Sequence, residues 1–177
     1  MLQRLPDDGS RRELLRGELI SAFPVNPRHG RVVGRLSARV VDYAFENDLG
    51  EVYVGDTGWR LERSPDTVLA PDIAFVQKDR LAEVNEAGFP ETYPDLVIEV
   101  LSPSNTAAEM MMKLGIYSSC GVAAVWIVEP AREVAEIHRK GQPLRRLGLD
   151  DALEDPDLLP GFSLTLRDLF RRRKSEQ

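Results

Sequence analysis

Two acidic residues lie in or beside apolar predicted strands, where an ionised side chain needs a charge partner. Glu99 lies in the run LVIEVL (96–101), whose aliphatic neighbours predict a strand buried on both faces. An ionised acid there is unfavourable unless a cation or a hydrogen-bond donor pairs with it. Asp72 follows Pro71 at the start of another predicted strand, IAFV (73–76). Because adjacent strands lie about 4.8 Å apart, these two acids can meet around one hard cation.

A third acid, Asp95, also follows a proline, but it lies on the same predicted strand as Glu99. Four residues at about 3.3 Å each separate the two positions by about 13 Å. One metal ion cannot bind both carboxylates. We therefore expect Asp95 to lie outside the site.

Lys113 is the candidate cation. It follows the Glu99 strand in a predicted helix, at the border of the apolar stripe, so its ammonium group can reach back towards the two acids. There it could orient or deprotonate a water molecule or stabilise a developing charge. A second interpretation fits the sequence equally well, because Glu109 lies four residues earlier and the two can form a solvent-exposed helical ion pair.

The composition limits the kinds of site that this chain can build. One cysteine, Cys120, and two histidines, His29 and His138, exclude a thiolate zinc cage and a histidine-rich metal site. The net charge of −6 argues against an extended, non-specific grip on nucleic acid, although a local basic groove remains compatible with it. Basic residues cluster in three places, for each of which a solvated surface is the simpler interpretation: Arg28, Arg31, Arg35 and Arg39; Arg139, Lys140, Arg145 and Arg146; and Arg171, Arg172, Arg173 and Lys174.

The sequence predicts one domain over residues 1–177, of mixed α/β or α+β class, with helices packed on a mixed sheet. An apolar stripe of helical period predicts a helix from 27 to 47, capped by Asn26. The other expected elements are a helical turn and a strand in 12–23, strands at 51–55 and 59–63, a polar excursion at 77–93, a helix capped by Ser104 or Asn105 and ending at Gly121, a hairpin at 123–140, a short strand with a helical turn at 159–170, and a flexible tail at 171–177.

Several stretches, taken together and in order, resemble the Uma-two-type restriction endonuclease family of the PD-(D/E)XK nuclease superfamily. They are RRELLRGELI (11–20), NPRHGRVVGRL (26–36), TVLAPDIAFV (67–76), the long stretch from Tyr93 to Pro130, and LPGFSLTLRDLF (159–170). An isolated Pro-Asp pair carries no weight, whereas the stretch from Pro94 to Pro130 is specific. The resemblance covers nearly the whole chain.

The resemblance implies a restriction-endonuclease-like mixed β-sheet and a magnesium-dependent phosphodiesterase site, in which manganese can substitute. Asp72 and Glu99 would hold the metal with the backbone carbonyl of Val100. The lysine usual two positions after the acid is absent, because Leu101 occupies that place. Lys113 matches a lysine that has moved into the next helix.

The family also carries acids near the N-terminus, in the positions of Glu13 and Glu18, and a His-Gly pair like His29-Gly30. We assign Glu18 an auxiliary metal role, with a surface acid as the alternative. We expect His29 to cap or pack the helix rather than bind metal. Ser102 precedes a predicted helix, and its hydroxyl could contact a phosphate group there. For Ser104, a helix cap is the simpler interpretation.

Two functions of different classes follow. The first is a magnesium-dependent endonuclease that acts on DNA, supported by Asp72, Glu99 and Lys113 together. The second is a catalytically inactive, dimeric binding or regulatory protein on the same fold, supported by Leu101 and the acidic charge; a glycosidase-like acid pair is disfavoured. We expect a homodimer, from the resemblance and from an apolar hairpin at 123–140 that we expect to be exposed. Without an apolar run of about 20 residues or an apolar N-terminal core, we expect a cytoplasmic protein with no membrane partner.

Overall fold

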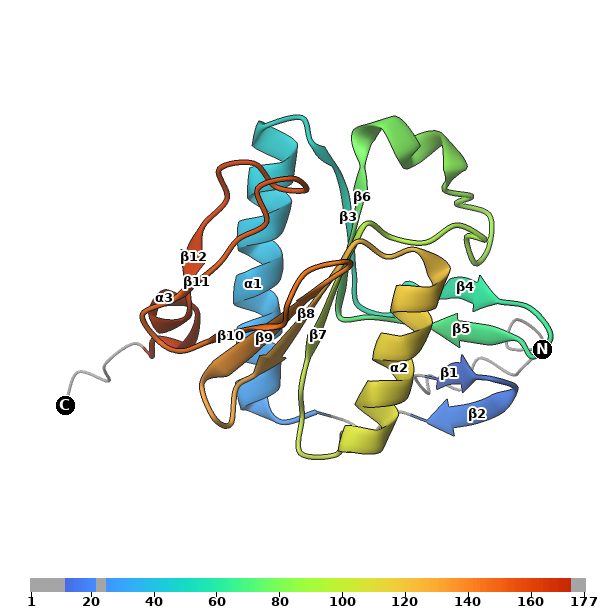
Figure 1. Cartoon of the computed structure of the whole chain (residues 1–177), viewed down its shortest axis with the longest axis horizontal. Helices are drawn as coiled ribbons and strands as arrows, with labels where there is room; N and C mark the ends of the chain where they lie inside the picture. The colour runs from blue at the N-terminus through green and yellow to red at the C-terminus, as the bar shows by residue number, and fades with distance from the viewer. Residues whose placement is uncertain (1–11, 22–24, 173–177) are drawn as a thin grey trace.

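The computed structural model describes residues 12–21 and 25–172 and contains a mixed β-sheet flanked by helices, as predicted (Figure 1). The elements are, in chain order, β1 (Arg12–Leu15), β2 (Glu18–Ser21), α1 (Pro27–Glu46), β3 (Gly50–Val54), β4 (Trp59–Glu62), β5 (Thr67–Leu69), β6 (Ile73–Gln77), the 3-10 helix η2 (Lys78–Glu83), β7 (Leu96–Val100), α2 (Ala107–Cys120), β8 (Ala124–Glu129), β9 (Val134–Arg139), β10 (Arg145–Leu147), β11 (Ala152–Leu153), β12 (Leu164–Thr165) and α3 (Leu166–Phe170).

The central sheet has six strands in the order β10-β9-β8-β7-β6-β3, and a smaller sheet has the order β2-β1-β5-β4. All pairs in the central sheet are antiparallel except β7 with β8. A parallel pair needs a crossover connection, and α2 supplies it. The helix therefore begins beside the carboxyl end of β7, where the Glu99 strand ends.

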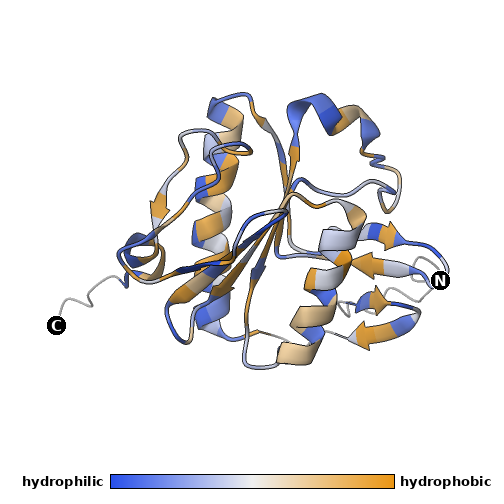
Figure 2. Cartoon of the chain, in the orientation of Figure 1, coloured by the Kyte–Doolittle hydropathy of each residue, from blue (hydrophilic) through white to orange (hydrophobic). Residues whose placement is uncertain are grey.

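The two faces of the central sheet carry different layers. Leu96, Ile98 and Val100 of β7 pack in one hydrophobic cluster with α1 and α3. Val97 packs in a second cluster with α2 and the smaller sheet. Since side chains alternate along a strand, Glu99 faces the α2 side with Val97. Figure 2 shows hydrophobic residues concentrated in the strands of the central sheet.

The helix boundaries largely follow the sequence signals. The Asn26 side chain accepts a hydrogen bond from the His29 amide and caps α1, as predicted. The cap of α2 is Thr106, whose hydroxyl accepts from the Glu109 amide, so the predicted cap at Ser104 or Asn105 is wrong by one or two residues. α2 ends at Gly121, as predicted, with the left-handed φ of 107°.

Two expectations for the chain are wrong. The strand expected after Gly17 is present as β2, but the helical turn expected before it is the strand β1, which pairs with β2 in an antiparallel hairpin. The hairpin β8–β9 exists, but it is not exposed, because Trp126 is fully buried and stacks on Phe162 at 6.1 Å between ring centroids. The hairpin therefore gives no support to a dimer.

Residues 173–177 of the tail lie outside the described residues. No described helix is long and apolar enough to cross a membrane.

Gly121→Ala is expected to lower the free energy of unfolding by about 1–3 kcal/mol. A Cβ there would lie 2.7 Å from the Tyr93 ring, on a backbone that L-residues rarely adopt. Gly115→Ala is the control within the same helix: its Cβ would meet no atom within 4 Å, so a gain of about 0.5–1 kcal/mol is expected. Urea unfolding measures both. An equal effect of the two substitutions would contradict this account.

Candidate active site

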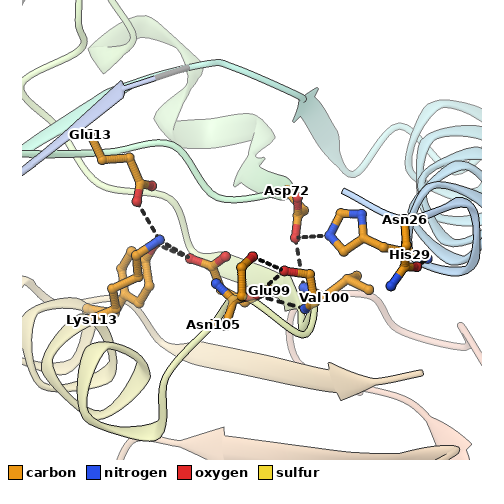
Figure 3. Close-up of polar contacts among 11 residues, drawn as sticks. Glu13, Asn26, His29, Asp72, Glu99, Val100, Asn105 and Lys113 are labelled. Atoms are coloured by element: carbon orange, nitrogen blue, oxygen red, sulfur yellow. Dashed lines mark hydrogen bonds and ion pairs between the residues drawn. The ribbon is translucent and has the colours of Figure 1, made fainter. Parts of the chain in front are cut away.

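A pocket of about 250 Å³ opens at the carboxyl end of β7. It lies between that strand end and the first turns of α1 and α2, and side chains from the smaller sheet close one side (Figure 3). Its ionisable lining residues are Glu13, His29, Asp72, Glu99, Glu109 and Lys113. Three carboxylates of this set are buried, which makes their charge partners the central question.

Glu99 is held on the α2 side by two contacts. Its Oε1 accepts a hydrogen bond of 2.7 Å from the Tyr117 hydroxyl and lies 3.7 Å from Lys113 Nζ. Burial raises the pKa of Glu99 to about 7; the Lys113 charge opposes this shift, and the carboxylates of Glu13 and Asp72 add to it. Burial, with the two neighbouring carboxylates, therefore outweighs the Lys113 charge at this acid.

Asp72 lies at the start of β6, beside the end of β7. Ile73 pairs with Ile98, and continuing this antiparallel register by one residue places Asp72 opposite Glu99. Asp72 Oδ2 accepts a hydrogen bond of 2.8 Å from the Val100 amide and lies 3.5 Å from His29 Nε2. The two acids thus occupy neighbouring strands at one sheet edge, the arrangement expected from the sequence.

Lys113 is buried, with 6% of its side chain exposed, and does not form the solvent-facing pair with Glu109. Its Nζ lies 2.6 Å from Glu13 Oε2 and 3.7 Å from Glu99 Oε1. Burial by itself lowers the Lys113 pKa, but the charges of Glu99 and Glu13 outweigh burial and raise it. Lys113 is therefore a fixed cation in this pocket.

Glu13, rather than Glu18, is the N-terminal acid at the pocket. Besides Lys113, it contacts the Ala70 amide, which donates a hydrogen bond of 2.8 Å to Glu13 Oε1. Glu18 lies exposed on β2, outside the pocket lining, so its auxiliary metal role has no structural basis. A strand over residues 12–15, in place of the predicted helical turn, points to Glu13. In that strand Glu13 lies next to the buried residues Leu14 and Leu15.

His29 and Ser102 complete the predicted set. His29 is buried, and within the described residues its Nδ1 has no hydrogen-bond partner. The Ser102 amide and hydroxyl both donate to Asn105 Oδ1, at 2.8 and 2.9 Å, which fixes the turn before α2. Ser102 lines the pocket, as does Asn105, whose place in the sequence predicted only a helix cap.

Asp95 lies at the other end of β7, as its distance from Glu99 predicted. Its carboxylate accepts hydrogen bonds from the Gln77 amide at 2.9 Å and from Arg80 Nη1 at 2.7 Å. These contacts anchor the segment after β6. Asp95 is therefore a structural acid.

Comparison with known proteins identifies the family. The sequence pattern of the Uma2 family, described as "Putative restriction endonuclease", matches residues 1–167. The chain belongs to the Uma2 family. A solved structure described as a "putative nuclease belonging to DUF820" from Anabaena variabilis matches this Uma2-family chain with a TM-score of 0.82 and 18% identity, over 96% of this chain and 94% of that one. At this identity the likeness concerns the fold, and no curated protein matches the chain.

The donors of this Uma2-family pocket fit a hard divalent cation. Among the described residues, no three or more His, Cys, Asp or Glu side chains are already gathered as a metal site. Asp72 and Glu99 could supply two carboxylates, and Mg²⁺ is commonly bound by one or two carboxylates while it keeps several waters. Repulsion from Asp72 and Glu13 contributes to the raised Glu99 pKa, so a cation between the acids would stabilise the ionised pocket.

Glu99→Gln is expected to remove a pH dependence of stability. The folded-state pKa of about 7 exceeds the ordinary value of 4.5, so between these pH values the folded protein holds a proton that the unfolded chain releases. The free energy of unfolding of the wild type therefore falls as pH rises through this range, by up to about 1.4 kcal/mol per unit. Urea unfolding in EDTA at several pH values measures the difference.

Between about pH 5 and pH 8, the wild type should lose roughly 2–3 kcal/mol relative to Glu99→Gln. Glu18→Gln is the control, since it neutralises an exposed acid of the same type. Its stability should follow that of the wild type. Parallel curves for the wild type and Glu99→Gln would show that Glu99 does not hold the proton.

Proposed function

We propose that this chain is a magnesium-dependent endonuclease that hydrolyses phosphodiester bonds of DNA. The observation that carries the proposal is the convergence of Asp72, Glu99 and Lys113 on one pocket at the carboxyl end of β7. Two carboxylates and a cation at one sheet edge suit the binding of a metal ion and the stabilisation of a charged phosphorane-like transition state. Membership of the Uma2 family supports the assignment to nucleases.

Asp72 and Glu99 are the proposed metal ligands, together with the backbone carbonyl of Val100, and manganese is expected to substitute for magnesium. When bound, the ion supplies Lewis-acid chemistry, which lowers the pKa of water and shields phosphate charge. The chain prepares this site from both sides. The Tyr117 hydroxyl orients Glu99, and the Val100 amide and His29 orient Asp72.

Lys113 acts in this proposal as a cation and not as a base. Its pKa is raised by Glu99 and Glu13, so it stays protonated at neutral pH and can donate to an attacking water or to a phosphate oxygen. Glu13 positions the ammonium group through the contact of 2.6 Å. Ser102, at the rim, is a proposed phosphate contact in the turn that leads into α2.

The second candidate function is a catalytically inactive, dimeric binding or regulatory protein. Leu101, in place of the usual lysine, favours it, as does the closer approach of Lys113 to Glu13 than to Glu99. Homodimerisation belongs to both candidates as a proposal. Light scattering on the purified chain tests it, and metal and cleavage measurements distinguish the two candidates.

Metal binding is the first test. Calorimetric titration of the wild type with Mn²⁺ is expected to give saturable heat, whereas Asp72→Asn and Glu99→Gln should each weaken binding at least tenfold, because each removes a charged ligand. Glu18→Gln should bind like the wild type. Equal heats for the wild type and Glu99→Gln, or none for both, would remove the foundation of the nuclease proposal.

Lys113→Met tests the cation separately from the metal. Mn²⁺ binding should persist, while cleavage of plasmid DNA should fall by about 100-fold or more, the range seen when a charge-stabilising donor is lost. Methionine keeps the aliphatic length in a buried position, and circular dichroism checks the fold. Lys78→Met, at an exposed lysine paired with Asp48, is the control and should cleave normally.

Cleavage by Lys113→Met within about threefold of the wild type would exclude Lys113 from the chemistry. Metal binding without cleavage by the wild type itself would favour the inactive binding protein.

A further inference from the structure

Helix α1 carries four arginines along one side. Arg28, Arg31, Arg35 and Arg39 follow one another at intervals of three or four residues, which places them on one helical stripe. The buried stripe of the helix, formed by His29, Val32, Leu36, Val40 and Ala44, points in another direction, into the core. We call the four arginines the arginine face. It stands out on a chain whose net charge is −6.

The charges of α1 run against the helix dipole. The amino end of a helix favours acids and the carboxyl end favours bases. α1 has no acid in its first turn and no base in its last turn; its own acids, Asp42 and Glu46, lie near the carboxyl end. Arg28, in the first turn, therefore adds to the positive potential of the helix start rather than cancelling it. Local rules are broken in this way mainly where a function requires it.

The arginine face is also short of internal charge partners. Within the described residues, Arg28, Arg31 and Arg39 form no ion pair. Elsewhere exposed arginines do pair: Arg146 with Glu136 at 3.1 Å and Arg167 with Asp150 at 2.6 Å. The positive charge of this face is thus available to an external anion.

Position links the arginine face to the pocket. α1 begins at the pocket, where His29 lies 3.5 Å from Asp72, and α1 and α2 start at the same edge of the molecule (Figure 1). From Arg28 to Arg39 there are 11 steps (39 − 28), a length of about 16 Å at 1.5 Å per residue. The arginine face therefore begins one residue from His29, which lines the pocket, and extends along α1 away from it.

A hollow of about 500 Å³ extends the arginine face towards α3. Arg35, Arg39 and Arg171 line it with the hydroxyl residues Ser163 and Thr165, and with one acid, Asp168. Arg35 Nη1 donates to the carbonyls of Asp168, Leu169 and Arg171 at 3.0, 2.6 and 2.7 Å. Arg35 thereby fixes the end of α3, which places Arg171 beside the arginine face.

We propose that the arginine face, with Arg171, binds the phosphate backbone of duplex DNA and so delivers a phosphodiester to the pocket. This inference rests on the proposed function and names the surface that holds its substrate. Guanidinium groups bind phosphate oxygens in a bidentate manner, and contacts to phosphates alone carry no sequence information. The grip is therefore electrostatic, independent of sequence and sensitive to salt.

The test is fluorescence anisotropy of a labelled duplex of about 20 base pairs, titrated with the full chain in EDTA at several salt concentrations. Arg31→Ala/Arg39→Ala is the main variant, because both residues are exposed and alanine favours a helix, so the fold is kept. The slope of log affinity against log salt should shrink by about 1.8, or 0.9 for each lost phosphate contact. Affinity at moderate salt should fall at least tenfold.

Two further variants sharpen the result. Arg31→Lys/Arg39→Lys keeps the charge and should retain the salt slope. Lys78→Ala/Lys140→Ala removes the same charge from residues that follow β6 and β9, at the opposite end of the central sheet from the pocket. Its slope and affinity should match those of the wild type.

An unchanged slope in Arg31→Ala/Arg39→Ala, a similar loss in Lys78→Ala/Lys140→Ala, or no binding of duplex by the wild type would each overturn the inference. Arginine-dependent binding of single strands alone would also overturn it. Cleavage is measured separately: binding that depends on the arginine face without any cleavage would contradict the proposed nuclease activity and leave this surface standing.

Discussion

The ion contact of Lys113 with Glu13 and Glu99 is the interaction on which the pocket depends. It joins α2, the smaller sheet and the central sheet through one buried ammonium group. Three buried carboxylates close to one another repel, and breaking a buried ion pair by removing one partner leaves an uncompensated charge. The buried ammonium group therefore links the packing of these layers to the charge balance of the pocket.

The topology explains why the pocket forms at this edge. The parallel pair β7–β8 forces a crossover, so α2 starts at the carboxyl end of β7 and presents Lys113 and Tyr117 to Glu99. The antiparallel neighbour β6 begins at the same edge and brings Asp72. α1 contributes His29 from the opposite face of the sheet. The acidic pocket and the start of the arginine face therefore lie at the same end of the central sheet.

Local signals in the sequence predicted much of this arrangement. Apolar periodicity and capping residues gave α1 and the end of α2, and apolar runs gave β6 and β7 with their acids. What failed depended on distant partners. Local signals do not favour Glu13 over Glu18, because the strand that holds Glu13 pairs with β5, more than 50 residues away. Lys113 had two equal interpretations, since only the tertiary fold decides between Glu109 and the buried acids.

The sequence separation of the pocket residues has a consequence for the synthesis of this protein. The pocket combines Glu13, Asp72, Glu99 and Lys113, and its first and last members are 100 positions apart in the sequence (113 − 13). The lysine is the last of the four along the chain. Loops of this length must close before the charges can meet. A chain still emerging from the ribosome, or one cut before α2, holds acids without their lysine. The three acids and their lysine therefore come together only in the fully folded chain. Any activity of the pocket then requires complete folding.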